Sequence, residues 1–348
     1  GNKDIVRSLI RNERPDMLWF MTDPRFYVWL WEMEDEIRPL IPMMYYHVWD
    51  NYPLPKFNKR FYDSTDVVVN ISKVTHQVVS ELADKADVIY HPHSVDTEIF
   101  KKLEPEVLEQ SMAQLAGNHG SDRVRFFWNN RNARRKQSGT LIFWFKEFLD
   151  RVGHDKAQLI MHTDPKDVNG QDLEAIVHEL ELGNGQVLFS VDKLAPEQLA
   201  VLYNMVDCTI NISDAEGFGL STLESLASET PIIVNMTGGL QEQVTDGEEW
   251  FGIGIEPASK SIIGSQDIPW IYEDRLSKED FVSSMEKMYK MSKEERAELG
   301  QKGRQHVLNN YNFENYGQRW VEIVDEACEK YGSWGDRKNY NSWRIEKL

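Results

Sequence analysis

The 348-residue sequence has only two cysteines and no apolar run long enough to cross a membrane. Cys208 and Cys328 are too few and too far apart for a disulfide framework or a metal-binding knuckle, so we expect reduced thiols in a cytoplasmic protein. The longest apolar stretch, residues 17–31, is interrupted by Thr22-Asp-Pro-Arg25. We see no signal peptide and expect no transmembrane segment.

Basic residues are outnumbered by acidic ones: 39 Lys and Arg against 57 Asp and Glu give a formal net charge of −18. Proteins that bind nucleic acids carry clustered Lys and Arg, and broad basic faces bind anionic lipid. Neither nucleic acid nor a membrane bound in this way is therefore an expected partner. The content of 41% apolar and 28% charged residues is that of a globular protein, and the length suits two domains.

Short apolar, β-prone segments alternate with helical ones along the chain. The predicted strands are residues 17–21, 41–46, 66–70, 87–90, 124–128, 158–161, 187–191, 208–212 and 231–235. Between two of them, residues 138–151 predict a helix with an apolar face that ends before Gly153, and residues 196–205 predict one that begins with proline. This alternation predicts an α/β protein with two parallel sheets, each covered by helices on both faces.

We place the first domain at residues 1–105, a polar linker at 106–122, the second domain at 123–313, and a helix and tail that return to the first domain at 314–348. The first domain shows no opening strand with a glycine-rich loop. Because doubly wound domains are usually larger, we expect the natural protein to carry about 80 further N-terminal residues. The alternative is a small domain whose sheet edge is covered by helix 314–330 or by a second subunit, which would make the protein a homodimer.

Two glutamates flank a glycine-rich turn after the predicted strand at 208–212. The turn reads Glu216-Gly-Phe-Gly-Leu220, and Glu224 lies in the helix that follows. Glycines let a backbone approach a ligand closely, and the N–H groups of a helix N-terminus attract phosphate. Carboxylates accept hydrogen bonds from sugar hydroxyls, so Glu216 would face the hexose and Glu224 the ribose of a nucleoside diphosphate sugar. Two alternatives stay open: Glu216 as a plain loop carboxylate, and Glu224 in a capping box with Ser221.

The same stretch resembles the donor-site signature of retaining GT-B glycosyltransferases, in particular the glycogen-synthase and mannosyltransferase-like group, family four. The resemblance rests on Ser213-x-x-Glu216-Gly-Phe-Gly-Leu-x-x-Leu-Glu224, then Thr230-Pro-Ile-Ile-Val and Thr237-Gly-Gly-Leu-x-Glu242. It covers residue 124 to about residue 256 and extends more weakly from residue 15 to the C-terminus. It implies two facing Rossmann-like domains that transfer a hexosyl unit from a GDP- or UDP-sugar to a hydroxyl of a sugar, lipid-linked or small-molecule acceptor.

The resemblance also implies which groups hold the diphosphate. Arg131 and Lys136 have the spacing of the family's basic pair, although Arg134 or Arg135 could substitute in register, and a solvated basic loop is the structural alternative. Cations placed there would stabilise the charge that develops on the leaving group. The backbone amides of the turn complete the set: Gly217, Phe218, Gly219 and Leu220. No metal and no other cofactor is therefore expected to be obligatory.

Further residues are assigned by position. His47 corresponds to a histidine that lines the sugar pocket in similar enzymes, with a purely structural histidine as the alternative. Trp49 and Asp50 are expected on the acceptor side, and Thr163 and Leu194 lie in loops expected to contact the nucleotide base. The catalytic assignment is thus Glu216, His47, Arg131 and Lys136.

Two other classes of function remain open. A nucleotide-sugar epimerase of the same architecture would form product without any acceptor. A non-catalytic sugar-binding protein with two similar lobes would have no need of groups that hold a diphosphate. A further alternative concerns one site only: His91 and His93 could bind a metal ion.

Overall fold

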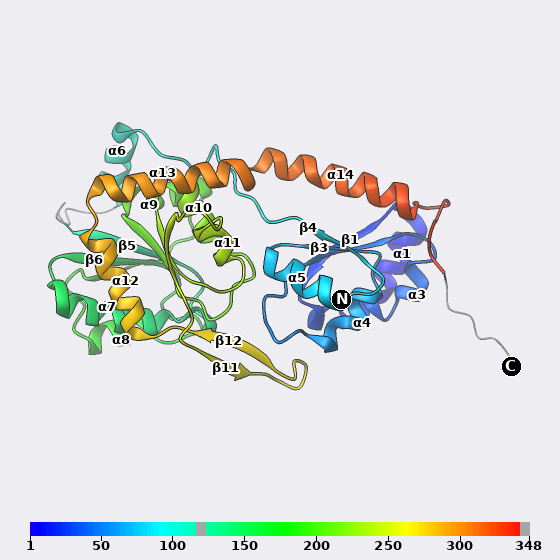
Figure 1. Ribbon diagram of the computed structural model, residues 1–348, viewed down its shortest axis with the longest axis horizontal. Coiled ribbons are helices and arrows are strands. Elements are labelled where there is room, and N and C mark those ends of the chain that lie inside the picture. Colours follow the sequence, from blue (N-terminus) through cyan, green and yellow to red (C-terminus); the bar gives the residue numbers. More distant parts are fainter. Residues whose placement is uncertain (116–122, 342–348) are drawn as a thin grey trace. The chain divides into compact units, whose positions relative to one another are not determined.

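The computed structural model describes residues 1–115 and 123–341, which form two α/β units (Figure 1). The first unit contains Gly1–His93, Ile262–Tyr272 and the chain from Glu314 onward. The second contains Ser94–Ser261 and Glu273–Phe313. The chain therefore passes between the units four times, after residues 93, 261, 272 and 313.

The first unit is built on a four-stranded sheet whose neighbouring strands all run parallel. The strands are β1 (Leu18–Thr22), β2 (Met43–His47), β3 (Val67–Asn70) and β4 (Asp87–Tyr90), in the order β1-β2-β3-β4. Because side chains alternate along a strand, Phe20, Tyr45 and Val68 lie in one core cluster on one face. Consecutive parallel strands place all their carboxyl ends at one edge of the sheet.

Helices cover both faces of this sheet. The helices that supply the core cluster are α1 (Lys3–Glu13), α2 (Val28–Trp31), α3 (Glu34–Ile37), α4 (Lys59–Asp63) and α5 (Lys73–Leu82). Two short 3-10 helices are η1 (Pro24–Phe26) and η2 (Lys56–Asn58). On the opposite face α14 (Phe313–Tyr331) packs Trp320 edge-on against Trp19 and Tyr46, with ring centroids 5.8 and 5.0 Å apart.

The second unit has a six-stranded sheet, again with parallel neighbours. Its strands are β5 (Val124–Asn129), β6 (Ala157–His162), β7 (Val187–Ser190), β8 (Cys208–Asn211), β9 (Ile232–Asn235) and β10 (Gly252–Ile255). The order is β10-β9-β8-β5-β6-β7, so the direction of chain progression reverses between β5 and β8. Ligands of open α/β sheets bind at the carboxyl ends of the strands at such a reversal.

Two groups of helices cover this second sheet (Figure 1). One group comprises α7 (Ser138–Val152), α8 (Leu173–Glu179) and α12 (Lys278–Lys290); the other comprises α9 (Pro196–Met205), α10 (Leu220–Ala227), α11 (Leu240–Val244) and α13 (Lys293–Asn310). Phe126, Phe145 and Phe281 lie in the core cluster between the sheet and the first group. No helix in residues 1–115 and 123–341 is long and apolar enough to cross a membrane.

The predicted fold class is confirmed: an α/β chain with two parallel sheets. The nine predicted strands coincide with β1–β9 within two residues. The first segment of the first unit ends at His93 rather than at residue 105, and the predicted linker overlaps helix α6 (Pro105–Leu115) of the second unit, whereas the chain returns to the first unit at Glu314. Residues 116–122 of that linker lie outside the described residues.

An arm of two strands was not predicted. It consists of β11 (Ser259–Ile263) and β12 (Ile271–Arg275), and its central residues 262–272 belong to the first unit (Figure 1). The side chains of the two strands are mostly exposed or half-buried, so the apolar runs that revealed the other strands are missing here.

Candidate active site

Lys136 and Glu216 come together at the reversal point of the second sheet. Lys136 ends η3 (Arg134–Lys136), which follows β5, and Glu216 lies in the turn that follows β8. β5 and β8 are neighbours, so both loops start at the same edge of the sheet. Lys136 Nζ donates to Glu216 Oε2 in an ion pair whose side chains are only 10% and 11% exposed.

Glu216 is held as an ionised carboxylate. Asn211 Nδ2 and Ser213 Oγ each lie 3.4 Å from its Oε2, and Arg135 Nη1 lies 4.0 Å from it. Burial alone would raise the pKa of Glu216, but the charges of Lys136 and Arg135 and the hydrogen bonds outweigh burial and lower it. A paired, buried anion differs from the plain loop carboxylate that the sequence left open.

Glycines shape the turn around Glu216. Gly219 has φ of 97° and forms the N-cap of α10, which no side chain of the described residues caps, so the first N–H groups of this helix lack a side-chain partner at the cap. Gly238 has φ of 49°, and a Cβ there would lie 1.8 Å from the Glu216 carbonyl oxygen. Gly239 donates its N–H to that same oxygen at 3.0 Å. Only glycine therefore fits at position 238, where the backbone supports the Glu216 turn.

The remaining turn residues differ in exposure. Phe218 is 3% exposed and packs against Tyr311, with ring centroids 5.8 Å apart, whereas Leu220 is 47% exposed. Gly217 lies between Glu216 and the buried Phe218. Phe218 points into the protein, so its side chain shapes the turn from inside, and its carbonyl accepts a hydrogen bond from Gln243 Nε2 at 2.8 Å.

Glu224 belongs to a short hydrogen-bonded chain. Tyr203 Oη donates to Glu224 Oε2 at 2.7 Å, and Asn129 Nδ2 donates to Tyr203 Oη at 2.9 Å. Burial raises the pKa of Glu224 to about 7. The capping-box alternative does not form, because the N-cap of α10 is Gly219 and not Ser221.

The arginines of the basic loop bind three different partners. Arg131, with a 63% exposed side chain, donates from Nε and Nη2 to Asp167 at 2.6 and 3.1 Å. Arg134 makes two bonds of 2.8 and 2.6 Å to Glu273, and Arg135 Nη1 donates to the carbonyl of Ala215. Lys136 is thus the predicted phosphate-binding cation that contacts Glu216 directly, while Arg131 lies in the same loop and points to Asp167.

A charged network beside this loop was missed by sequence reasoning. Arg275 Nη1 donates to Asp214 at 2.6 Å, and its Nη2 donates to Glu273 at 2.9 Å. Burial raises the pKa of Asp214 to about 6, although bonds from Gln137 and the Arg275 charge oppose that rise. The available signal was the placement of Glu273 and Arg275 two residues apart, on one face of a strand. Among the described residues, no three or more His, Cys, Asp or Glu side chains are grouped to hold a metal ion.

The two residues predicted to contact the base follow the strands β6 and β7. Thr163 is 7% exposed, and its Oγ1 is buried without a hydrogen-bond partner among residues 1–115 and 123–341. Leu194 is half-buried in the loop before α9. Since buried hydroxyls nearly always have a partner, the Thr163 hydroxyl is a candidate for contact with a ligand.

His47, at the end of β2 in the first unit, is fully buried and already bonded at both ring nitrogens. Nδ1 pairs with Asn70 Oδ1 at 2.9 Å and Nε2 with Tyr62 Oη at 3.0 Å. Burial lowers the pKa of His47 to about 3, so the ring is neutral. A bond from His47 to a sugar would require one of these two contacts to break.

The acceptor-side residues follow β2. Trp49 is 5% exposed and donates from Nε1 to the Asn51 carbonyl at 2.8 Å, whereas Asp50 is half-buried. Both side chains belong to the first unit. Their assignment to an acceptor stays a prediction.

The sequence pattern of the family described as glycosyl transferases group 1 matches residues 130–306, just over half of the 348 residues. The chain belongs to this family. The resemblance inferred from the motif is therefore confirmed, and the matched range contains Arg131, Lys136, Glu216 and Glu224.

Relatives agree with this membership. The chain is 25% identical over 188 residues to alpha-monoglucosyldiacylglycerol synthase of Streptococcus pneumoniae, which covers 53% of this chain and 41% of that protein. It is also 25% identical over 190 residues to D-inositol 3-phosphate glycosyltransferase of Corynebacterium aurimucosum, covering 53% and 44%. The match thus spans less than half the length of these two curated relatives.

Solved structures support the fold. Sucrose-phosphate synthase from Thermosynechococcus elongatus has a TM-score of 0.75 at 18% identity, covering 94% of this chain and 77% of that one. Anabaena HepE, crystallised with UDP and glucose, has a TM-score of 0.70 at 13% identity, covering 92% and 81%. Both similarities support the GT-B architecture for this group 1 chain.

Proposed function

We propose that this protein transfers a hexosyl unit from a nucleoside diphosphate sugar, GDP- or UDP-linked, to an acceptor hydroxyl with retention of configuration. The observation that carries the proposal is the Lys136–Glu216 ion pair beside the N-terminus of α10. It sets a cation, an ionised carboxylate and helix N–H groups at the reversal point of one sheet. A donor that combines phosphates with sugar hydroxyls needs these three kinds of group.

Lys136 and Arg131 would hold the diphosphate. Negative charge grows on the leaving phosphate as the sugar bond breaks, so cations fixed there stabilise the transition state more than the ground state. Arrival of a phosphate would also draw Lys136 away from Glu216. The Glu216 carboxylate would then accept hydrogen bonds from the transferred hexose.

Glu224 would bind the ribose. Tyr203 orients its carboxyl by bonding Oε2, and Oε1 would accept a hydrogen bond from a ribose hydroxyl. Thr163, whose buried hydroxyl lacks a partner among the described residues, would contact the base with Leu194 beside it. His47, Trp49 and Asp50 stay proposals for the sugar and acceptor side.

The family resemblance suggests the reaction path. The acceptor hydroxyl would attack the anomeric carbon from the face that the phosphate leaves, and a leaving phosphate oxygen would take the acceptor proton. Glu216 would position the sugar and would not form a bond to it. Lys136, Arg131 and the amides of the turn would meet the phosphate charge without an obligatory metal, and a cytoplasmic location remains part of the proposal.

Calorimetric titration with UDP, GDP and their common sugars tests this assignment. We expect Lys136→Ala and Arg131→Ala each to weaken nucleotide binding by roughly 10- to 100-fold, because bonds to charged groups contribute about 1.5–3 kcal/mol. Lys287→Ala, which removes an exposed lysine of the same unit, should leave the affinity unchanged. Unchanged affinity in both loop variants, with their folds intact, would remove the phosphate assignment.

Product analysis separates the proposal from its nearest rival. A transferase should release nucleoside diphosphate and glycosylated product only when an acceptor is present, apart from slow hydrolysis. An epimerase would instead convert the donor with no acceptor in the sample.

A further inference from the structure

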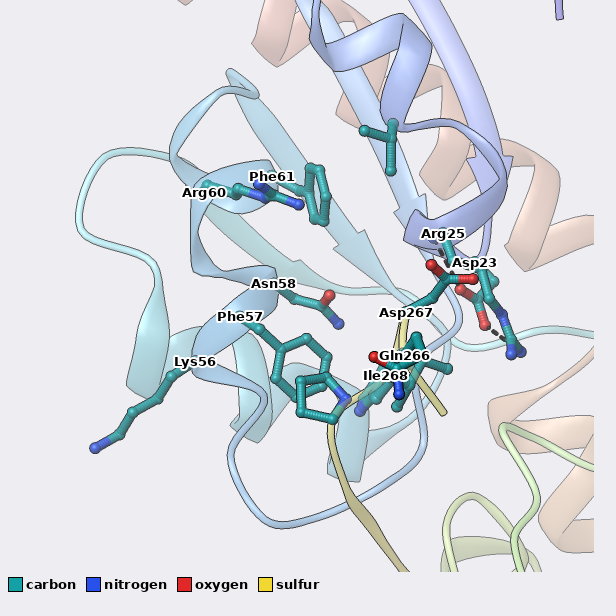
Figure 2. Close-up of a pocket in the computed structure, with 13 residues that line it drawn as sticks. Asp23, Arg25, Lys56, Phe57, Asn58, Arg60, Phe61, Gln266, Asp267 and Ile268 are labelled. Carbon is teal, nitrogen blue, oxygen red and sulfur yellow. Dashed lines mark hydrogen bonds and ion pairs between the residues drawn. The ribbon is translucent and has the colours of Figure 1, made fainter. Parts of the chain in front are cut away.

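A pocket of about 650 Å³ lies within the first unit (Figure 2). Its walls come from three segments: the chain after β1, the chain from Trp49 to Phe61, and residues 266–269 at the tip of the arm. The volume falls in the range of roughly 300–1,000 Å³ that small-molecule sites occupy. None of the second-unit residues assigned above lines it.

The arm is built into this unit as a fixed wall. Ile268, at its tip, is 7% exposed and belongs to the core cluster of the first sheet. Tyr272 donates its backbone N–H to the Tyr52 carbonyl, and Asn51 Nδ2 donates to the Tyr272 carbonyl at 3.0 Å. Residues more than 200 positions apart in the sequence are therefore held together to form one cavity.

One buried polar group in the pocket has no hydrogen bond to any residue that the structure describes. Asn58 is 3% exposed, and this group is its Nδ2. Figure 2 shows the Asn58 amide extending between Phe57 and Phe61 toward the tip of the arm. An unpaired buried amide costs free energy, and a ligand with a hydroxyl acceptor would remove that cost.

The charges in the pocket nearly cancel. Asp23 and Arg25 pair with each other at 2.9 Å, and the Arg60 guanidinium lies 4.7 Å from the Phe61 ring centroid. The other charged side chains are Lys56, which points away from the cavity in Figure 2, and Asp267 on the arm. Asp23 pairs with Arg25 and Lys56 points away, so the lining residues present no cluster of cations to a phosphate-rich ligand, and their mixed donors and acceptors suit a neutral polyol.

Aromatic rings add apolar surface to the polar groups of the pocket. Trp49, Phe57 and Phe61 give the pocket apolar surfaces next to the amide of Asn58 and the carboxylate of Asp267. A pyranose has the same division, since its ring C–H faces are apolar and its rim carries hydroxyls. A lipid chain would leave the buried Asn58 amide without a partner and would take water away from the exposed Asp267 carboxylate, and both effects are unfavourable.

We propose that this pocket binds a carbohydrate, with Asn58 and Asp267 bonding its hydroxyls, and that this sugar is the acceptor of the transfer. The binding half of the proposal stands on the pocket alone. The acceptor half rests on the proposed function and names a sugar, rather than a lipid chain, as the part of the acceptor that the protein recognises.

The test is a titration of the full chain with small ligands, in which binding is detected by saturation-transfer NMR and by tryptophan fluorescence. The probes are methyl α-glucopyranoside, methyl α-mannopyranoside, myo-inositol and inorganic phosphate. We expect at least one polyol to bind and Asp267→Ala to weaken it roughly tenfold, as for loss of one bond to a charged group. Asp35→Ala removes an exposed carboxylate of the same unit outside the pocket and should change nothing.

Phe57→Ala provides a second variant that acts through stacking rather than charge, and it should also weaken the sugar. The proposal is overturned if no polyol binds at about 100 mM, where a millimolar ligand is saturating, or if phosphate displaces the sugar. Sugar affinity unchanged in both Asp267→Ala and Phe57→Ala would overturn it as well.

UDP and GDP titrations on the same samples separate the two proposals. Sugar binding without nucleotide binding would leave the pocket in place and remove the transferase function. Nucleotide binding without sugar binding would do the reverse. If both ligands bind, the bound sugar should become glycosylated when donor is added. Recovery of the sugar in unmodified form would refute the acceptor role.

Discussion

At the scale of single residues, the Lys136–Glu216 pair is the feature that most needs an explanation. Two charges are taken almost completely out of water, and the desolvation cost of such a pair often exceeds the attraction between its members. Two apolar side chains of similar size would stabilise the fold at least as much as this ion pair does. A functional role, in which a ligand takes over one partner, accounts for the pair better than stability does.

Removing only one member should therefore be costly. We expect Lys136→Met to lower the free energy of unfolding by about 3 kcal/mol, because Glu216 is left buried with the more distant Arg135, 4.0 Å away, as its cation. The double variant Lys136→Met with Glu216→Gln should recover most of this loss while binding nucleoside diphosphate roughly 10- to 100-fold more weakly than the wild type. Urea unfolding measures both effects.

The surface pair Lys146–Asp150, with side chains 32% and 46% exposed, is a matched control. Lys146→Met should cost less than about 1 kcal/mol, as for exposed ion pairs. Equal losses at Lys136 and Lys146 would contradict the buried-pair account.

Glu224 should make stability depend on pH. Its folded pKa of about 7 lies above the usual 4.5, so the folded state keeps a proton that the unfolded state has lost between these values. The contribution of this group to the free energy of unfolding is largest below pH 4.5, falls as the pH rises toward 7, and is absent above pH 7. The total change is about 3 kcal/mol.

Glu224→Gln removes this dependence and keeps an oxygen for the Tyr203 hydroxyl. The variant should be more stable than the wild type at pH 8, and the two should converge near pH 4.5. Urea unfolding across that range tests the sign, and a difference that stays constant with pH would show that folding does not raise the pKa of Glu224.

At the scale of elements, two glycines with positive φ differ in what surrounds them. At Gly238 a Cβ would collide with the Glu216 backbone, whereas at Gly247, with φ of 103°, nothing lies within 4 Å. Gly247→Ala should cost about 1–2 kcal/mol of backbone strain alone. Gly238→Ala should cost at least about 2 kcal/mol more and also abolish nucleotide binding, because the turn that holds Glu216 must move.

Urea unfolding and calorimetry on the two alanine variants check this difference. If both lose the same free energy and Gly238→Ala still binds nucleotide, the loop does not position Glu216.

The sequence predicted elements well where burial produced a signal. β3 and β8 are buried on both faces, so their apolar runs marked them, and proline at Pro196 marked the start of α9. Pairing across long separations left no such signal. The family resemblance assigned Lys136 and Glu216 to one donor site but did not predict their ion pair. That pair, the pair of Arg131 with Asp167, and the insertion of Ile268 into the first unit depend on tertiary packing that no local pattern records.

At the scale of the whole molecule, each unit carries a separate set of groups. Lys136, Glu216 and Glu224 all lie in the second unit, and the pocket with Asn58 and Asp267 lies in the first. Each unit also has a sheet and a core cluster of its own. Units of this kind can often fold separately.

We therefore expect Ser94–Phe313 to fold alone when residues 262–272 are replaced by a two-residue Asn-Gly turn. β11 and β12 form a two-stranded sheet, and such a turn closes a hairpin. The shortened protein should bind UDP or GDP within about 1 kcal/mol of the full chain, roughly a fivefold change, and should lose sugar binding entirely. Lys136→Ala in this background should weaken nucleotide binding by the same factor as in the full chain, roughly 10- to 100-fold. If the shortened protein unfolds in a single cooperative transition yet binds nucleotide far more weakly, residues of the first unit contact the nucleotide, and the assignment of donor binding to the second unit alone is wrong.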